Sequence, residues 1–481
     1  MKSLIAFDIG TTNCKLVITD PRGKVLFTAK ESYPSHETPE GAHEQDPEQI
    51  RAAFLKLLDT AGTETDLATA RFACFSAAMH SLIPVSSEGK ALAPMMTWAD
   101  TRSNAVAIAL RDTEAGQTIY QATGTPIHPM SPLCKIAWLR ESNPGLYNST
   151  HKFISIKEYL WFHLFGEFEI DHSIASATGL LDLRSRAWYQ PALDAAGISA
   201  EKLSRLVPVG HTRKKDGLDF IIGASDGALA NLGTGAIQPG EVALTIGTSA
   251  AVRIISREPL QDAGGRLFNY IVDEDHFLCG GASNNGGIAL RWFVDSFYPD
   301  KKDTDLNILL QEAAAVAPGA DGLIFLPYIY GERAPVWDAS AAGLFFGIHS
   351  RHNRASFLRA VLEGICFGLK QLLEAIEDNG AGIQVVLASG GFTASPVWLE
   401  ILSGILGKPV RLAQDADASA MGAIFLGMKE TGMVESLEAT GSLLDERTVA
   451  DPVAGEAAAY GRNYAIFSRL YGKLRDEFHQ G

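Results

Sequence analysis

The sequence predicts an α/β protein made of two related domains, and three observations support this prediction. At 481 residues the chain is too long for one compact core and suggests two or three domains. Apolar strand-like runs alternate with segments of helical periodicity along the whole chain. Residues 9–12 read I-G-T-T, and near the middle of the chain residues 246–249 read I-G-T-S in the same setting. We place the domain boundary near Pro239–Gly240.

Each copy of this repeat consists of an apolar run, a Gly-Thr turn and a second apolar run. Residues 4–9 and 15–18 flank the first turn, and residues 241–246 and 252–255 flank the second. Two apolar runs joined by such a turn predict a β-hairpin. Its recurrence about half a chain later predicts a duplicated domain. Because the motif is short, an unrelated tight turn is the alternative.

The periodicity of apolar residues predicts the other elements of both halves. Short apolar runs predict buried strands at 72–75, 221–224 and 385–388. Helical spacing predicts helices at 47–58, 100–111, 132–141, 157–164 and 353–377. An aromatic stripe near the C-terminus repeats at helical spacing, and we interpret it as core packing: Tyr460, Tyr464, Phe467, Leu470, Tyr471, Leu474 and Phe478.

Composition and charge exclude several classes of protein. The chain is 46% hydrophobic and 20% charged, which is typical of a folded globular protein and not of a disordered one. No apolar run is long enough to span a membrane, and residues 1–10 do not resemble a secretory signal. The formal net charge of −15 disfavours nucleic acid and anionic membranes as partners. The five scattered cysteines form no C-x-x-C pair and predict free thiols, so we expect a cytoplasmic protein.

The first hairpin turn has the chemistry of a phosphate and metal site. Gly10 permits a tight turn, and successive N–H groups with the Thr11 and Thr12 hydroxyls can bind an anion. The Asp8 carboxylate at the strand end can hold a hydrated Mg²⁺. The second turn repeats the hydroxyls but has Thr245 in place of the aspartate. A plain surface hairpin is the alternative; no P-loop or G-x-G-x-x-G motif occurs.

A second candidate segment is Gly223-Ala224-Ser225-Asp226-Gly227, where an apolar strand ends in small residues around one carboxylate. Small neighbours would allow a substrate to approach closely, and Asp226 could accept a proton from its hydroxyl group. The alternative is that Asp226 caps the helix that follows. Spacing does not separate these two interpretations.

The segment Thr97-Trp98-Ala99-Asp100-Thr101-Arg102 combines an apolar plate, an acceptor and a bidentate donor. Carbohydrate sites need this mixture of groups. The alternative is a helix start capped by Asp100 with an exposed Asp–Arg pair. Met79 and His80 follow another strand in a similar small-residue context, where the histidine could equally be structural. Gly-rich turns at 280–287 and 389–392 could lie against a nucleotide base or its phosphates.

Taken together, these motifs resemble the FGGY family of carbohydrate kinases over essentially the whole chain. The matching segments, in order, are DIGTTN, TWADTR, MSPLCKIAWL, GASDG, IGTSA, SGGF and a late MGA. Ser142 and Ser356 depart from the family signatures at positions that we do not assign to catalysis. The resemblance implies two ribonuclease-H-like (actin-like ATPase) α/β domains around a central cleft. Residues 1–239 would form the sugar-binding N-terminal domain and 240–481 the nucleotide-binding C-terminal domain.

The resemblance also assigns roles residue by residue, with ATP and Mg²⁺ as cofactors. Asp226 resembles the catalytic base and, with Asp8, the metal-site carboxylates. Ten residues of this chain match positions that contact ATP in the family: Thr11, Thr12, Asn13, Gly247, Thr248, Ser249, Gly287, Gly390, Gly391 and Ser395. The sugar contacts resemble Met79, His80, Trp98, Asp100 and Arg102.

Within the family, the segments SAAMHS, TGTPIHPM, SIKEYL and NNGG look most like those of gluconate kinases. This resemblance implies phosphorylation of D-gluconate to 6-phosphogluconate. A substrate carboxylate needs a cationic or strong donor partner, for which Arg102, His80 and His128 are candidates. Kinases for xylulose or another sugar or polyol are the alternative, and a non-catalytic actin-like ATP switch is the alternative from another class. A small sugar or sugar acid is the expected partner, with a homodimer as one assembly state.

Overall fold

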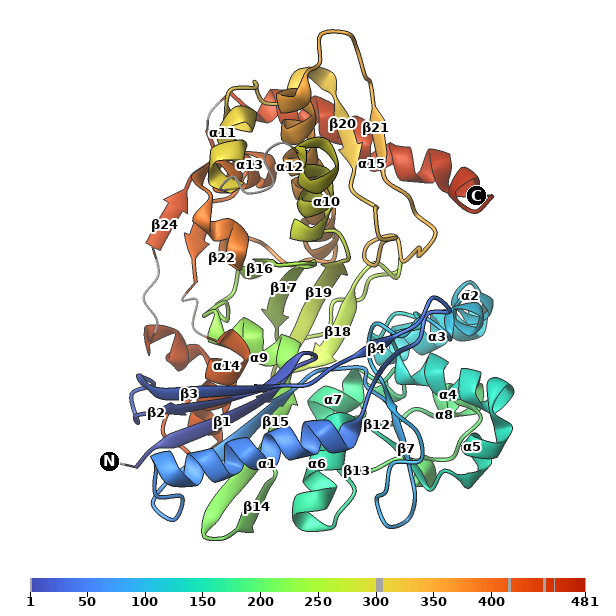
Figure 1. The fold of residues 1–481 in the computed structure, drawn as a ribbon, viewed down its shortest axis with the longest axis vertical. Helices are drawn as coiled ribbons and strands as arrows, with labels where there is room; N and C mark the ends of the chain where they lie inside the picture. The colour runs from blue at the N-terminus through green and yellow to red at the C-terminus, as the bar shows by residue number, and fades with distance from the viewer. Residues whose placement is uncertain (1, 300–305, 414–416, 444–446, 454, 481) are drawn as a thin grey trace. The chain divides into compact units, whose positions relative to one another are not determined.

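The computed structural model describes residues 2–299, 306–413, 417–443, 447–453 and 455–480. The chain divides into two compact units, each of which contains strands and helices (Figure 1). Unit 1 comprises Met1–Ile237, Ser256–Leu278 and Ala416–Leu443. Unit 2 comprises Gln238–Ile255, Cys279–Asp415 and Leu444–Gly481. The predicted fold class, α/β with two related domains, is confirmed.

The central sheet of unit 1 has six strands in the order β14-β15-β6-β1-β2-β3. It is mixed, because β1 pairs in parallel with β6 and β6 with β15, whereas the β1–β2, β2–β3 and β14–β15 pairs are antiparallel. The predicted strands at 72–75 and 221–224 are therefore confirmed as parts of β6 and β15. The bounds are β1 Leu4–Ile9, β2 Asn13–Thr19, β3 Val25–Ser32, β6 Phe72–Ala77, β14 Thr212–Lys215 and β15 Leu218–Ser225.

Side-chain alternation along β1 separates a packing face from a face that carries chemistry. Ile5, Phe7 and Ile9 belong to one apolar core with the buried side of α1 (Pro47–Glu64). Successive strand residues point to opposite faces, so Asp8 lies on the other face. Helix α14 (Ala418–Glu430) packs on β1 and β6, and close to α9 (Asp226–Gly233). A Cβ at Gly422 would meet the Leu229 carbonyl oxygen at 1.9 Å, so this helix crossing requires glycine.

The rest of unit 1 consists of short helices and small sheets, of which α2, α3, α4 and α8 contribute to a second apolar core, whereas α6 and β7 pack into the first. Its paired strands are β4 (His36–Glu37), β5 (His43–Gln45) and β8 (Met95–Met96); β7 (Ile83–Val85) and β9 (Lys152–Ile154); β10 (Glu169–Asp171) and β13 (Arg205–Val207); β11 (Leu181–Asp182) and β12 (Ala187–Trp188). Its helices are α2 (Asn104–Arg111), α3 (Glu114–Thr123), α4 (Pro132–Ser142), α5 (Pro144–Ser149), α6 (Ile156–Phe165), α7 (His172–Ser176), α8 (Gln190–Ala196), η1 (Ala200–Lys202) and η5 (Glu438–Leu443), and β18 (Phe268–Ile271) lies against α7.

Unit 2 is also built on a mixed sheet, in which β19, β17, β16, β22, β23 and β24 are neighbours in this order. The β16–β17 pair is antiparallel and β16–β22 is parallel. The strands are β16 (Glu241–Ile246), β17 (Ala250–Ser256), β19 (Phe277–Ser283), β22 (Val385–Ser389), β23 (Val410–Leu412) and β24 (Arg447–Ala450), with a separate pair β20 (Ile324–Leu326) and β21 (Leu344–Phe346). The helices are α10 (Gly287–Phe297), α11 (Leu306–Ala314), η3 (Ala320–Gly322), α12 (Arg354–Asp378), η4 (Gly391–Ala394), α13 (Pro396–Leu406) and α15 (Ala457–Phe478).

Most elements predicted from periodicity are confirmed, including both hairpins: β1–β2 in unit 1 and β16–β17 in unit 2. The aromatic stripe lies on α15, where Tyr460, Phe467 and Leu470 are buried, as a core role requires. One start was wrong: the helix predicted from residue 100 begins at Asn104. All five cysteines are buried free thiols. Along the stretches that the structure describes, no helix has the length and apolar character to cross a membrane.

Candidate active site

The turn of the first hairpin, Gly10–Asn13, is held by one internal hydrogen bond and by hydrogen bonds from three side chains outside it. The Gly10 amide donates to the Asn13 carbonyl at 3.0 Å, and the Tyr33 hydroxyl donates to the Gly10 carbonyl. Buried Gln45 donates to the Thr11 carbonyl at 2.6 Å. The Trp98 indole nitrogen donates to the Thr11 hydroxyl at 3.2 Å. This last contact joins a predicted phosphate residue to a predicted sugar residue.

Asp8, at the end of β1, has an environment that perturbs its carboxyl group strongly. It is 8% exposed and accepts a 2.7 Å hydrogen bond from the Ser76 hydroxyl. Burial raises the pKa of Asp8 to about 7, and the negative charges of Asp226 and Asp417 add to this rise. The Ser76 hydrogen bond and the Lys15 charge oppose it. Asp8 and Asp226 are thus within electrostatic reach of each other, which is the arrangement that a site for a divalent cation needs.

Asp226 is the first residue of α9 and directly follows β15. The Ser225 hydroxyl accepts from the Ala228 amide and serves as the N-cap, so the interpretation of Asp226 as the helix cap is wrong. Asp226 is half-buried, and its backbone carbonyl accepts a hydrogen bond from the Ser419 hydroxyl on α14. One oxygen of its carboxyl group accepts a hydrogen bond from the Gly227 amide at 2.7 Å. A carboxylate in this position is chemically able to bind a metal ion or accept a proton.

An irregularity in β15 determines how the chain approaches Asp226. The register with β6 shifts between Ile221 and Ala224, and Gly223 has a φ of 70°. A Cβ there would lie 1.8 Å from the Phe75 carbonyl oxygen, so only glycine fits. Buried Lys157 donates to the carbonyls of Ile222 and Ala224 and pairs with Asp171 at 2.7 Å. The strand end before Asp226 is therefore held from both sides.

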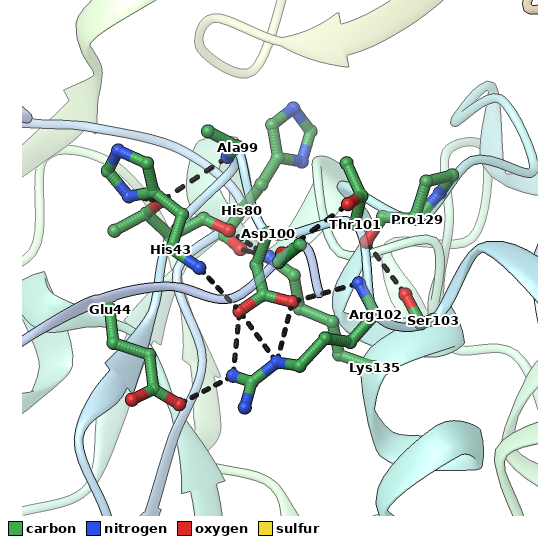
Figure 2. Close-up of polar contacts among 12 residues, drawn as sticks. His43, Glu44, His80, Ala99, Asp100, Thr101, Arg102, Ser103, Pro129 and Lys135 are labelled. Carbon is green, nitrogen blue, oxygen red and sulfur yellow. Dashed lines mark hydrogen bonds and ion pairs between the residues drawn. The ribbon is translucent and has the colours of Figure 1, made fainter. Parts of the chain in front are cut away.

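The TWADTR segment turns back on itself around a fully buried carboxylate (Figure 2). Asp100 accepts hydrogen bonds from the His43 amide, the Arg102 amide and the Arg102 guanidinium, the shortest of which is 2.7 Å. Arg102 also pairs with Glu44 at 2.6 Å and lies 4.9 Å from the centre of the Trp138 ring. The interpretation as an exposed Asp–Arg pair at a helix start is therefore wrong. In Figure 2 the Arg102 guanidinium lies on the opposite side of Asp100 from the His80 ring.

His80 adopts an unusual backbone conformation on the loop after β6. Its φ is 65°, and the side chain is 8% exposed. Its Nδ1 lies 2.8 Å from the Ala177 carbonyl and its Nε2 3.4 Å from the Tyr270 hydroxyl. Met79 beside it is half-buried. His128, also half-buried, accepts from the Met130 amide through Nδ1.

In unit 2 the second Gly-Thr turn adjoins a cavity of about 330 Å³. Gly287 approaches this turn closely, because its amide donates to the Gly247 carbonyl at 2.8 Å. The walls are mainly apolar, and backbone from three Gly-rich segments reaches the cavity. The lining residues are Ile246, Gly247, Gly287, Leu290, Arg291, Val294, Leu306, Asn307, Leu310, Gly391, Phe392, Ala394, Ser395 and Trp398. Its mixture of flat apolar surface and close backbone suits a planar heterocyclic ligand.

The structure groups the predicted residues into two sets. In unit 1 the contacts connect Thr11 with Trp98, and electrostatics connect Asp8 with Asp226. In unit 2, Gly247, Gly287, Gly391 and Ser395 line one cavity. Thr12, with Asn13 bonded to its hydroxyl, and Thr248 lie exposed at the two turns; Ser249 is half-buried, and Gly390 has a φ of 104° directly before Gly391. The ligand roles of all these residues stay predictions.

Sequence reasoning missed two groups that complete these sets. Lys15, two residues after the first turn, pairs with Asp417 at 2.5 Å. No local pattern links two residues some 400 positions apart, although a lysine on the same strand as Asn13 was a visible signal. The cavity walls from α10 and α13, including Trp398, were also missed, because no local motif marks their apolar side chains as the lining of a cavity. Within the described residues, no three His, Cys, Asp or Glu side chains are grouped so that they could hold a metal.

Comparison with known proteins identifies the family. The N-terminal domain of the FGGY family of carbohydrate kinases matches residues 3–233, and the C-terminal domain matches residues 242–430. The chain belongs to the FGGY family of carbohydrate kinases. It is 37% identical to a gluconokinase of Bacillus subtilis over 99% of this chain and 97% of that protein.

Solved structures agree with this assignment. A gluconate kinase from Lactobacillus acidophilus has a TM-score of 0.95 at 31% identity, covering 100% of this chain and 99% of the other. A ligand-bound xylulose kinase from the same organism has a TM-score of 0.94, also at 31% identity, with full coverage of both chains. Structural similarity alone therefore does not choose between these two substrates.

Proposed function

We propose that this protein transfers the γ-phosphoryl group of ATP to a hydroxyl of D-gluconate and releases 6-phosphogluconate. The proposal for a kinase with Asp226 as its base is carried by one observation: Asp226 begins α9 beside the buried Asp8 carboxyl, within electrostatic reach of it. The choice of gluconate is supported by the 37% identity to a gluconokinase over nearly the full chain.

Asp226 is the proposed general base. Its carboxylate accepts the proton of the attacking hydroxyl group as the new bond to phosphorus forms. Gly223 allows the strand before Asp226 to pack tightly against the Phe75 carbonyl, which fixes where Asp226 emerges from the sheet. The Gly10–Asn13 turn carries amide and hydroxyl groups that can donate to phosphoryl oxygens, and the Gly247–Ser249 turn of unit 2 carries the same kinds of group. Transfer requires the phosphorus to lie in line with the acceptor oxygen.

Asp8 and Asp226 would hold Mg²⁺, which when bound neutralises charge on the transferring phosphates. Two carboxylates suit Mg²⁺, because this ion keeps several waters and is bound by one or two carboxylates plus substrate phosphates. Asp8 must lose its proton to act as a ligand, and the raised pKa makes this step depend on pH. Lys15, paired with Asp417, supplies a positive charge beside the same carboxylates.

The adenine ring of ATP fits the cavity of unit 2. Phe392 and Trp398 supply aromatic surface, and Gly287 and Gly391 allow the backbone to approach the ligand closely. Arg291 and Asn307 lie among the lining residues and can donate to ring nitrogens or ribose hydroxyls. This placement predicts that substitutions in the cavity change the KM for ATP.

A substrate panel tests the choice of sugar. ADP release is measured by a coupled assay with gluconate, xylulose, glycerol and related sugars, polyols and sugar acids at matched concentrations. A site built to hydrogen-bond its substrate can reject a mismatched one by about 10⁴-fold, so we expect one clear preference, for gluconate. A kcat/KM for xylulose far above that for gluconate would assign the protein to xylulose instead. ATP hydrolysis unaffected by every acceptor would reject the kinase proposal.

A further inference from the structure

Lys135 is a fully buried lysine whose charge the proposed reaction does not use. It lies on α4, and its side chain has 0% exposure. Its Nζ donates to the carbonyl oxygens of His80 and Thr97, each at 2.6 Å (Figure 2). Among the described residues, no salt bridge joins Lys135 to a carboxylate; Asp100 acts on it only through its charge. The amine therefore serves two backbone groups.

The two carbonyls belong to separate loops that carry predicted sugar contacts. His80 follows Met79 on the loop after β6, and Thr97 precedes Trp98 on the loop after β8. The loops are also bridged by the backbone pairing of Leu82 with Met96. Lys135 connects the two loops next to this bridge, because His80 comes two residues before Leu82 and Thr97 directly follows Met96. Its amine is thus a cross-link between the two loops.

This cross-link restrains a residue, His80, whose backbone is strained. A φ of 65° costs a residue other than glycine about 1–3 kcal/mol, and it persists only where the surroundings enforce it. The ring is held at Nδ1 by Ala177 and at Nε2 by Tyr270, and Lys135 holds the carbonyl. Loss of the Lys135 contact removes one restraint on the peptide after His80, so we expect the strained backbone to relax and the ring to shift.

Burying this amine is costly, which indicates that its position serves more than packing. Burial lowers the pKa of Lys135 to about 7, against the opposing effect of the Asp100 charge. A methionine of similar length would fill the same space without this cost, and buried charges can often be replaced by apolar residues with no loss of stability. The lysine provides what a methionine cannot, namely two directed hydrogen bonds.

We propose that Lys135 is a positioning residue that fixes the His80 loop and the Thr97–Trp98 loop in the geometry that binds the acceptor sugar. This inference rests on the proposed function, since it assumes that these loops contact the sugar. Lys135 acts through the backbone and touches neither the phosphates nor the proton acceptor. Its loss should therefore weaken sugar binding and sugar discrimination, while affinity for ATP and the chemical step change little.

Lys135→Met is the principal test, and Lys152→Met is its matched control. Lys152 also donates to two backbone carbonyls, those of Glu201 and Leu203, at 2.9 and 2.8 Å, but it lies away from both loops. A hydrogen bond from a charged group contributes about 1.5–3 kcal/mol. We therefore expect the gluconate KM of Lys135→Met to rise about tenfold or more. We expect the kcat of Lys135→Met and its KM for ATP to change less than about threefold. In Lys152→Met, the gluconate KM, the KM for ATP and kcat should all stay close to the wild-type values.

The outcomes separate this inference from the function on which it rests. If the wild-type protein phosphorylates no member of the panel, the proposed function fails. If the wild-type protein is active and folded Lys135→Met keeps its gluconate KM, or loses kcat alone, the role of Lys135 is wrong. Lys135→Gln, which keeps a donor group but is shorter and uncharged, should give an intermediate KM and a reduced gluconate-induced rise in Tm. Loss of folding in both Lys135 variants while Lys152→Met folds would assign Lys135 to stability and overturn the proposal.

Discussion

Gly390→Ala should disable the proposed nucleotide site through a single methyl group. Gly390 directly follows β22 and precedes Gly391, which lines the cavity of unit 2. Its φ of 104° lies in the region that favours glycine, and a Cβ would lie 2.3 Å from the Ile246 carbonyl oxygen. That oxygen belongs to the last residue of β16, directly before the Gly247–Ser249 turn. The new methyl group therefore pushes on the proposed phosphate turn.

Two contributions determine the size of this effect. Backbone strain at such a φ costs about 1–3 kcal/mol, and overpacking against fixed backbone costs about 1–3 kcal/mol more. Part of this energy is relieved by displacement of the turn, and each 1.4 kcal/mol lost from binding is about a tenfold loss of affinity. We therefore expect the KM for ATP to rise about 10- to 100-fold, with the gluconate KM unchanged.

Gly380→Ala is the control for strain without collision. Gly380 has a φ of 94°, and nothing lies within 4 Å of the Cβ that it would gain. It should lower the Tm as Gly390→Ala does through strain, but leave the KM for ATP unchanged. Steady-state kinetics with varied ATP and thermal unfolding of both variants provide the comparison. An unchanged KM for ATP in folded Gly390→Ala, or equal rises in both variants, would refute the reasoning.

Two further predictions concern the cavity and acid stability. Val294→Trp should fill part of the cavity of about 330 Å³, raising the KM for ATP by about tenfold with little loss of Tm, and an unchanged KM would count against the adenine site. Burial alone would raise the pKa of Glu169, but hydrogen bonds from Arg213 and Trp161 and the charge of His211 lower it to about 2 from an ordinary value of 4.5. This carboxylate therefore stabilises the folded state, a contribution that is fully present above pH 4.5 and is lost as pH falls toward 2. Glu169→Gln should be less stable in urea at pH 7 and lose less stability on acidification than the wild type, and equal slopes would contradict this account.

The fold could be predicted from the sequence because its signals are local. The apolar runs around Gly10 and Gly247 contain their own turns, and both hairpins formed as predicted. Helix α12 combines long apolar periodicity with an Asn353 cap, and its start was predicted within one residue. The predicted start of α2 was wrong because Asp100 resembles an N-cap residue in the sequence, whereas in the structure its carboxylate accepts hydrogen bonds from Arg102 and the His43 amide. Only tertiary structure decides between those two uses of a carboxylate.

The site could be predicted only in part, for a related reason. Asp8 and Asp226 stood out because each carboxylate follows an apolar strand among small or hydroxyl residues. The lysines around the site were harder to predict, although Lys15 lies on the same strand as Asn13. Lys15 meets Asp417 through a contact between distant parts of the chain, and Lys135 and Lys157 look like surface residues until their burial is known. Long-range contacts and burial carry this information, and a single sequence displays neither.

The central claim is that Asp226 accepts the proton of the sugar hydroxyl. Asp226→Asn keeps the size and helical position of the side chain but removes its basicity. The decisive measurement is the kcat for ADP release with saturating gluconate and MgATP, made alongside ATP binding to the same folded variant. We expect kcat to fall by about 10²- to 10⁴-fold while ATP still binds. A kcat within a few-fold of the wild type would contradict the account.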